Sequence, residues 1–170
     1  MDLLILNFIQ ENCHNGFTDT IFPFITMMGD SGLIWVLIGI ALAITKKYRK
    51  AALILFASLI LTHIIGGLIL KPIVARPRPF VTFPDVTLLI NAPNEFSFPS
   101  GHAGSSFAAA TILWKANRKF GIPALVLASL IAFSRVFLFV HYPMDIIVGA
   151  ILGVLCALIC WKLCKKMVKI

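Results

Sequence analysis

The sequence predicts an all-α membrane protein: a polytopic bundle of about five spanning helices, with surface helices at its N-terminal end. Of the 170 residues, 59% are hydrophobic and only 13% are charged. The mean hydropathy of +0.96 lies outside the range of soluble globular domains. Five apolar runs approach the roughly 20 residues that cross a bilayer core. They cover 33–44, 51–70, 103–114, 122–140 and 146–161, and they are expected to be helical because lipid offers the backbone no hydrogen-bond partner.

The first 29 residues are predicted to form surface or re-entrant helices. In "DLLILNFIQENCHNG", Asn7, Glu11 and His14 recur at helical spacing and leave an apolar stripe too short to span, as in a helix that lies flat on a membrane. A signal peptide is the competing interpretation, but a basic n-region and a small-x-small cleavage site are missing. Pro23 interrupts the next apolar run, so 16–29 is predicted as a second surface or re-entrant helix.

Basic residues cluster at alternate ends of successive spans and predict the topology. The clusters are "KKYRK" at 46–50, "KANRK" at 115–119, and Lys162, Lys165, Lys166 and Lys169. The positive-inside rule places all three in the cytoplasm, with the N-terminus outside. The segments 71–101 and 140–145 then face outward together in a multi-pass protein of the plasma membrane. This distribution argues against a nucleic-acid partner, although the net charge is +8.

No internal repeat or linker divides the chain, so residues 1–170 are predicted to form a single membrane domain, with 1–29 as surface or re-entrant helices and 31–165 as the bundle. The segment 71–99 is the only long connection and carries six of the nine prolines. Long connections in compact proteins are usually functional.

Two residue patterns concern packing. Gly149 and Gly153 form G-x-x-x-G in the last span, which favours close packing inside the bundle and leaves a homodimer as the alternative. Trp35, Trp114 and Trp161 fall toward helix ends, a pattern typical of interfacial anchors.

The stretch "KPIVARPRPF" places Lys71, Arg76 and Arg78 on the outer side, against the positive-inside rule. A solvated basic loop that contacts lipid headgroups is one interpretation. A dedicated anion site is the other.

The stretch "FPSGHAGSS" begins a span at the same surface. The N–H groups and the positive dipole end of such a helix bind phosphate readily. Gly101 allows close approach of the backbone to a ligand, Ser100 can cap the helix or donate to an anion, and His102 lies in the first turn.

The stretch "SRVFLFVHYPMD" supplies the third group of polar residues. Arg135 lies near the end of a span, where an unpaired Arg at mid-bilayer would cost about 2.5 to 3.5 kcal/mol, so it requires a partner or an aqueous pocket. His141 follows at the outer end, and Asp145 in the next helix can accept a hydrogen bond from it. The other imidazole nitrogen is then available as a nucleophile or base.

Together the three stretches resemble the type 2 phosphatidic acid phosphatase family, whose signature is K-x6-R-P, then P-S-G-H, then S-R-x5-H-x3-D. Every position is present: Lys71 with Arg78-Pro79, Pro99 to His102, and Ser134-Arg135 with His141 and Asp145. The resemblance covers about 31 to 165. Family members commonly have six spans, whereas five are predicted here, so the role of the N-terminal region is left open.

The resemblance implies a phosphohydrolase that works through a covalent phosphohistidine, without a metal ion or other cofactor. His141 would attack phosphorus, Asp145 would orient it, and His102 would protonate the leaving oxygen and then activate water. The phosphoryl oxygens would be bound by Lys71, Arg78, Ser100, Gly101 and Arg135. Arg76 lies outside the signature and is expected to help attract the phosphate.

An outward pocket walled by lipid-contacting helices favours a lipid phosphate as substrate, with membrane lipids around it. Undecaprenyl diphosphate is the first choice, because the family includes small bacterial members with this substrate; phosphatidylglycerol phosphate and phosphatidic acid are alternatives. From another class, a non-enzymatic lipid-binding or transport protein is the rival hypothesis. The signature also resembles that of vanadium haloperoxidases, but those proteins are soluble.

Overall fold

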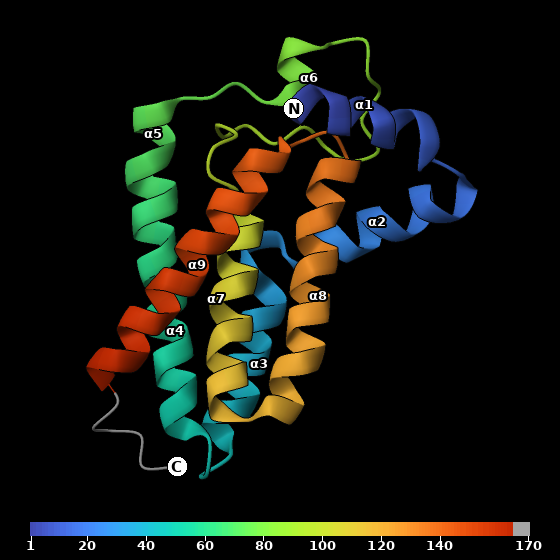
Figure 1. Cartoon of the computed structure of the whole chain (residues 1–170). Helices are drawn as coiled ribbons and strands as arrows, with labels where there is room; N and C mark the ends of the chain where they lie inside the picture. Colours follow the sequence, from blue (N-terminus) through green and yellow to red (C-terminus); the bar gives the residue numbers. More distant parts are fainter. Residues whose placement is uncertain (165–170) are drawn as a thin grey trace.

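A computed structural model describes residues 1–164, and over this range every regular element is a helix (Figure 1). In chain order these are α1 (Asp2–Asn12), α2 (Gly16–Met28), η1 (Asp30–Gly32), α3 (Leu33–Ile44), α4 (Arg49–His63), η2 (Ile64–Leu70), α5 (Lys71–Val74), α6 (Pro79–Thr82), α7 (Gly101–Ala116), α8 (Arg118–Phe137) and α9 (Pro143–Cys164). The predicted all-α bundle is confirmed.

Within residues 1–164, three segments are long and apolar enough to cross a membrane: Arg49–Thr82, Arg118–Phe137 and Pro143–Cys164. The pair Gly16–Met28 and Asp30–Ile44 would add a fourth as one broken span, bent by 47°. The helix α7, with 16 residues, is shorter than a usual span. All five predicted helices of the bundle are present, while the number that cross the membrane stays a prediction.

The helix α7 lies at the centre of the bundle, in contact with α4, α8 and α9 (Figure 1). Its side chains are small: Ala103, Ala108, Ala109 and Ala110 are all fully buried. Small residues let helix backbones approach closely where lipid provides no hydrophobic driving force between helices. The first turn of α7, which carries the P-S-G-H motif, is therefore held in place by three neighbours.

The glycines of the G-x-x-x-G pattern bring α9 against α7. A Cβ atom at Gly153 would lie 2.1 Å from the carbonyl oxygen of Gly104, and one at Gly149 would lie 2.5 Å from that of Ser100. At the same contact, the backbone N–H of Ser100 donates to the carbonyl oxygen of Asp145 at 3.0 Å. Close packing inside the bundle is confirmed, and the homodimer stays a prediction. The second and third motifs are thus adjacent in space.

Trp35 corrects one prediction. Its side chain is fully buried, and its indole Nε1 donates to the Ser106 hydroxyl at 2.9 Å. It joins α3 to α7 inside the bundle and is not an interfacial anchor. A buried Trp needs such a partner for its N–H group.

The N-terminal helices cover one end of the bundle (Figure 1). Leu6 and Ile9 of α1 are buried in a cluster with Phe137 and the residues that follow α8. Pro23 lies inside the next helix, α2, which is continuous from Gly16 to Met28. The first turn of α2 is held by a capping box formed by Asn15 and Thr18. Whether these helices lie on the membrane, re-enter it or span it stays a prediction.

The basic clusters and the long connection lie at opposite ends of the bundle. The α3–α4 and α7–α8 connections share one end, while α1 and α6 lie at the other (Figure 1). Lys71 lies on a helix and not in the connection, because the segment that begins at Arg49 stays helical to Val74. Of the third predicted basic cluster, Lys165, Lys166 and Lys169 lie outside the described residues.

Candidate active site

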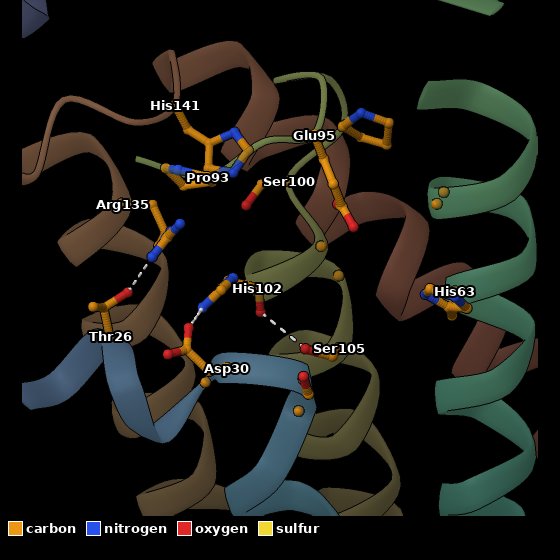
Figure 2. Close-up of a pocket in the computed structure, with 18 of the residues that line it drawn as sticks. Thr26, Asp30, His63, Pro93, Glu95, Ser100, His102, Ser105, Arg135 and His141 are labelled. Carbon is orange, nitrogen blue, oxygen red and sulfur yellow. Dashed lines mark hydrogen bonds and ion pairs between the residues drawn. The ribbon is translucent and has the colours of Figure 1, made fainter. Parts of the chain in front are cut away.

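A cavity of about 1150 Å³ opens at the end of the bundle where the long connection lies. Its wall includes seven of the eight predicted site residues: Lys71, Arg78, Ser100, Gly101, His102, Arg135 and His141. Asp145, the eighth, is fully buried and contacts His141. Figure 2 shows His141, Arg135, Ser100 and His102 directed toward a shared space. The three sequence motifs therefore meet.

His141 and Asp145 are arranged as a histidine–carboxylate pair. Nδ1 of His141 lies 3.5 Å from Oδ2 of Asp145. The Ser97 hydroxyl donates to the same carboxylate oxygen and lies 3.3 Å from Nδ1. The backbone N–H of Tyr142 also donates to Oδ2, at 3.0 Å. Ser97 is a lone serine in the long connection, and nothing in the sequence pattern distinguished it.

The other ring nitrogen of His141 is placed to act as a nucleophile. Nε2 lies 3.2 Å from Nη1 of Arg78. A guanidinium can donate hydrogen bonds but cannot accept them, so the contact favours an unprotonated Nε2 that accepts. Burial lowers the pKa of His141 to about 3, against the opposing effect of Asp145. A neutral imidazole with its lone pair on Nε2 is therefore the resting form at neutral pH.

The two arginines of the signature are buried and oriented by hydrogen bonds. Arg78 donates from Nε to the carbonyl oxygen of Glu95 at 2.6 Å and from Nη1 to that of Val140 at 2.8 Å. Arg135 donates from Nη1 to the hydroxyl of Thr26 at 2.5 Å, and its Nε has no hydrogen-bond partner within residues 1–164. A buried cationic donor without a partner is costly. An anionic ligand would satisfy it.

Lys71 forms an ion pair across the mouth of the site. Its ammonium donates to Oε2 of Glu95, whose side chain is 72% exposed while that of Lys71 is 10% exposed. This hydrogen bond and the charge of Lys71 lower the pKa of Glu95. Glu95 lies next to the anion site, and the sequence did not indicate this role, because a lone acid in a loop belongs to no motif.

The first turn of α7 presents its backbone to the cavity. Ser100 is the N-cap, and its hydroxyl accepts from the N–H of Ala103 at 3.4 Å. A Cβ atom at Gly101 would meet nothing within 4 Å, so the space above this turn is open. The positive end of the helix dipole thus points into the space that Arg78 and Arg135 border.

Arg76 does not have the role expected from the sequence. Its guanidinium donates to Oδ1 of Asp145 at 2.7 Å and to Oδ2 of Asp2 at 2.8 Å, and it lies over the Tyr142 ring at 3.8 Å. These contacts occupy Arg76 behind the histidine–carboxylate pair, and it is absent from the cavity wall. Arg76 is therefore placed to orient Asp145, and its guanidinium is neutralised by the two carboxylates that it contacts.

His102 lies across the cavity from His141. Its Nε2 is 2.9 Å from Oδ1 of Asp30, at the junction of α2 and α3 (Figure 2). Among residues 1–164, no group of three His, Cys, Asp or Glu side chains is arranged to hold a metal ion. The positive charges that face the cavity are those of Lys71, Arg78 and Arg135.

Fold and site together define a helical membrane protein with a buried histidine–carboxylate pair beside an anion site. The family profile described as "PAP2 superfamily" matches residues 51–169, and the chain belongs to this family. It is 33% identical over 120 residues to an undecaprenyl-diphosphatase of Sulfolobus acidocaldarius, covering 70% of this chain and 58% of that protein. It is 39% identical over 121 residues to a decaprenylphosphoryl-5-phosphoribose phosphatase of Mycobacterium tuberculosis, covering 71% and 64%. The chain thus spans about three fifths of the length of these two relatives.

A solved structure resembles the whole chain. The crystal structure of Aquifex aeolicus LpxE superposes with a TM-score of 0.83 at 28% sequence identity, and the match covers 95% of this chain and 94% of that one. This match includes most of the N-terminal region, which the family profile does not reach.

Proposed function

We propose that the protein is an integral membrane phosphatase that hydrolyses a lipid phosphate or diphosphate through a phosphohistidine at His141, without a metal ion. One observation carries the proposal. His141, with Asp145 behind it, faces a cavity whose wall also holds three cations and the N-terminus of α7. That set of groups can bind a phosphoryl group and attack it from one side.

Each group has a role in the proposed reaction. Nε2 of His141 attacks phosphorus, and Asp145 stabilises the charge that develops on the ring. The phosphoryl oxygens are bound by Lys71, Arg78, Arg135, Ser100 and the N–H of Gly101. Fixed donors of this kind stabilise the transition state of phosphoryl transfer without reorganising. His102 protonates the leaving oxygen and later takes a proton from the water that releases phosphate.

A lipid substrate is supported by the composition of the cavity wall. Beyond the charged residues, the wall includes apolar side chains of α2, α3, α4 and α9: Met27, Val36, Leu59, Ile60 and Leu152. An apolar tail could lie there while the phosphate lies on the cations. Undecaprenyl diphosphate is our first choice, because the relatives named above act on polyprenyl phosphates by name. Phosphatidylglycerol phosphate and phosphatidic acid are the alternatives.

We place the protein in the plasma membrane with its site on the extracytoplasmic face. The support is the charge distribution: the α3–α4 connection with Lys46 and Lys47 and the first turn of α8 with Lys119 lie at the end of the bundle opposite the cavity. Lipid carriers exposed at that face would reach the site from the membrane.

The test is phosphate release from the protein purified in detergent. Undecaprenyl diphosphate, phosphatidylglycerol phosphate and phosphatidic acid are compared in EDTA, beside the His141→Ala variant. We expect turnover in EDTA, a loss of at least about 10³-fold in the variant, and acid-labile phosphate on the parent after a rapid quench. Turnover that needs a metal, or that survives His141→Ala, would refute the mechanism. Lipid binding without any turnover would favour the non-enzymatic class.

A further inference from the structure

The family profile begins at residue 51, yet the preceding segment contributes to the cavity wall. Thr26, Gly29, Asp30, Ser31 and Gly32 all line the cavity. These residues end α2 and form the short η1 turn before α3, and we call 26–32 the α2–α3 junction. None of them belongs to the three sequence motifs, so the reason for their position has to come from their contacts.

The α2–α3 junction contacts two residues of the site. The hydroxyl of Thr26 accepts from Nη1 of Arg135 at 2.5 Å. Oδ1 of Asp30 accepts from Nε2 of His102 at 2.9 Å, a contact that Figure 2 draws across the cavity wall. His102 is the proposed acid and base of the reaction. The junction therefore contacts one anion-binding group and the group that moves protons.

The backbone of the junction is shaped for this approach. A Cβ atom at Gly29 would lie 2.7 Å from Cδ2 of His102 and 2.7 Å from Cγ2 of Ile131, so only glycine permits the imidazole to lie this close. Ser31 and Gly32 have φ values of 52° and 68°. A left-handed conformation at a residue other than glycine is uncommon and tends to occur where the surrounding structure imposes it. The turn presents Asp30 to His102.

We propose that Asp30 is a positioning residue for His102, and that the α2–α3 junction is part of the active site. The Asp30 carboxylate holds the hydrogen on Nε2, so Nδ1 is the atom that gives and takes the proton of the reaction. Its negative charge also stabilises the imidazolium form that acts as the acid. The site then has two histidine–carboxylate pairs with opposite tasks: Nε2 of His141 is kept unprotonated, and Nε2 of His102 keeps its hydrogen.

The proton balance of the cycle closes. In the first step Nε2 of His141 bonds to phosphorus, the bond from phosphorus to the leaving oxygen breaks, and that oxygen keeps the electron pair and takes the proton from Nδ1 of His102. In the second step water bonds to phosphorus, the phosphorus–nitrogen bond breaks with its pair returning to His141, and Nδ1 of His102 takes the proton of the water. The hydrogen on Nε2 of His102 remains in its hydrogen bond to Asp30 during both steps.

The experiment compares leaving groups, because an acid matters only where the leaving oxygen needs a proton. Two substrates with the same alkyl tail are used: an alkyl phosphate, whose alkoxide is a poor leaving group, and a nitrophenyl phosphate, whose phenolate is a good one. We expect Asp30→Asn to lower kcat/KM for the alkyl ester by about tenfold or more, and for the nitrophenyl ester by less than about threefold. His102→Ala should show the same asymmetry more strongly, and Asp30→Glu should recover part of the loss.

The chain offers a matched control. Asp19 of α2 pairs with Nδ1 of His14 at 2.7 Å, and neither residue lines the cavity. Asp19→Asn removes the same kind of histidine–aspartate pair from the neighbouring helix α2, and we expect it to change kcat/KM equally little for both esters. Equal losses on both esters in Asp30→Asn, or no loss on either, would overturn the proposal.

Two further arms keep the result interpretable. If Asp30→Asn does not remain monodisperse in detergent, Asp30→Ser is read by the same criterion. The inference rests on the proposed function, and the two fail differently. A parent protein that releases no phosphate refutes the function, whereas an active parent with a uniform response to Asp30→Asn refutes only the role of Asp30.

Discussion

His141 is a buried histidine in the wall of the cavity. Its side chain is 2% exposed and lies against the fully buried carboxylate of Asp145, and its Nε2 accepts a hydrogen bond from Arg78. Burial lowers its pKa to about 3 from an ordinary value of 6.5. The neutral ring is needed for attack on phosphorus, because a protonated Nε2 has no lone pair to give.

Acid should destabilise the protein in part through His141. The unfolded state takes up a proton on this ring below pH 6.5, while the folded state does not until about pH 3, so stability is lost as the pH falls through that window. Between pH 6.5 and pH 5 the loss is about 2 kcal/mol. We expect thermal unfolding followed by Trp fluorescence to show a smaller decrease in Tm over this range in His141→Gln than in the parent. Parallel pH profiles would contradict the assignment.

Glu95 occupies part of the anion site before any ligand binds. Its carboxylate is paired with Lys71, and because that pairing lowers its pKa, Glu95 stays ionised across pH 5 to 8. A phosphate that reaches Lys71 must displace this carboxylate. Glu95→Gln should therefore strengthen inhibition by orthophosphate a few-fold, in line with the roughly 0.2–1 kcal/mol of an exposed ion pair.

The comparison needs a charge-matched control from the same connection. Asp85→Asn removes one negative charge from an exposed position outside the cavity wall, and it should leave the inhibition constant of orthophosphate close to that of the parent. Weaker inhibition in Glu95→Gln would mean that Glu95 holds Lys71 in place for the ligand and does not compete with it.

At the scale of elements, the contact between α7 and α9 brings the second motif to the third. It depends on Gly149 and Gly153, which let α9 lie against the backbone of Ser100 and Gly104. The backbone hydrogen bond from Ser100 to Asp145 is made at this contact. A larger residue would separate the two helices where Ser100 of the anion site and Asp145 of the histidine–carboxylate pair are held together.

Gly153→Ala tests this contact. The added Cβ would lie 2.1 Å from the carbonyl oxygen of Gly104, so α9 has to move, and overpacking of this kind costs about 1–3 kcal/mol. We expect a lower Tm in detergent together with reduced turnover. Gly16→Ala is the matched control, because a Cβ there meets nothing within 4 Å. Equal Tm values for the two variants would show that the close approach of α9 to α7 does not contribute to stability.

At the scale of the whole molecule, the basic clusters and the candidate active site lie at opposite ends of the bundle. The basic connections lie at one end, and the cavity with the proline-rich connection lies at the other. An excess of Lys and Arg in the cytoplasmic loops sets the orientation of membrane proteins during insertion. The three cations of the site do not oppose this orientation, because each is paired or buried within the cavity wall.

The orientation can be measured by labelling single cysteines in intact cells. The native Cys13, Cys156, Cys160 and Cys164 are first replaced by alanine. Asn94→Cys at the cavity end and Lys47→Cys at the basic end are then introduced at exposed positions. A membrane-impermeant maleimide should label Asn94→Cys on intact cells and Lys47→Cys only after permeabilisation. The reverse pattern would place the site on the cytoplasmic face.

The sequence by itself determined the helices of the bundle and the eight motif residues, because hydropathy and motif spacing are local properties of the chain. Its charge bias predicts the orientation, which stays a prediction. The tertiary structure decided which polar groups complete the site. Asp30 and His102 are 72 positions apart, Ser97 belongs to no motif, and Arg76 turned out to orient Asp145. The physical reason is that a buried charge takes the nearest partner in space, and the packing of α2, α7, α8 and α9 sets that distance.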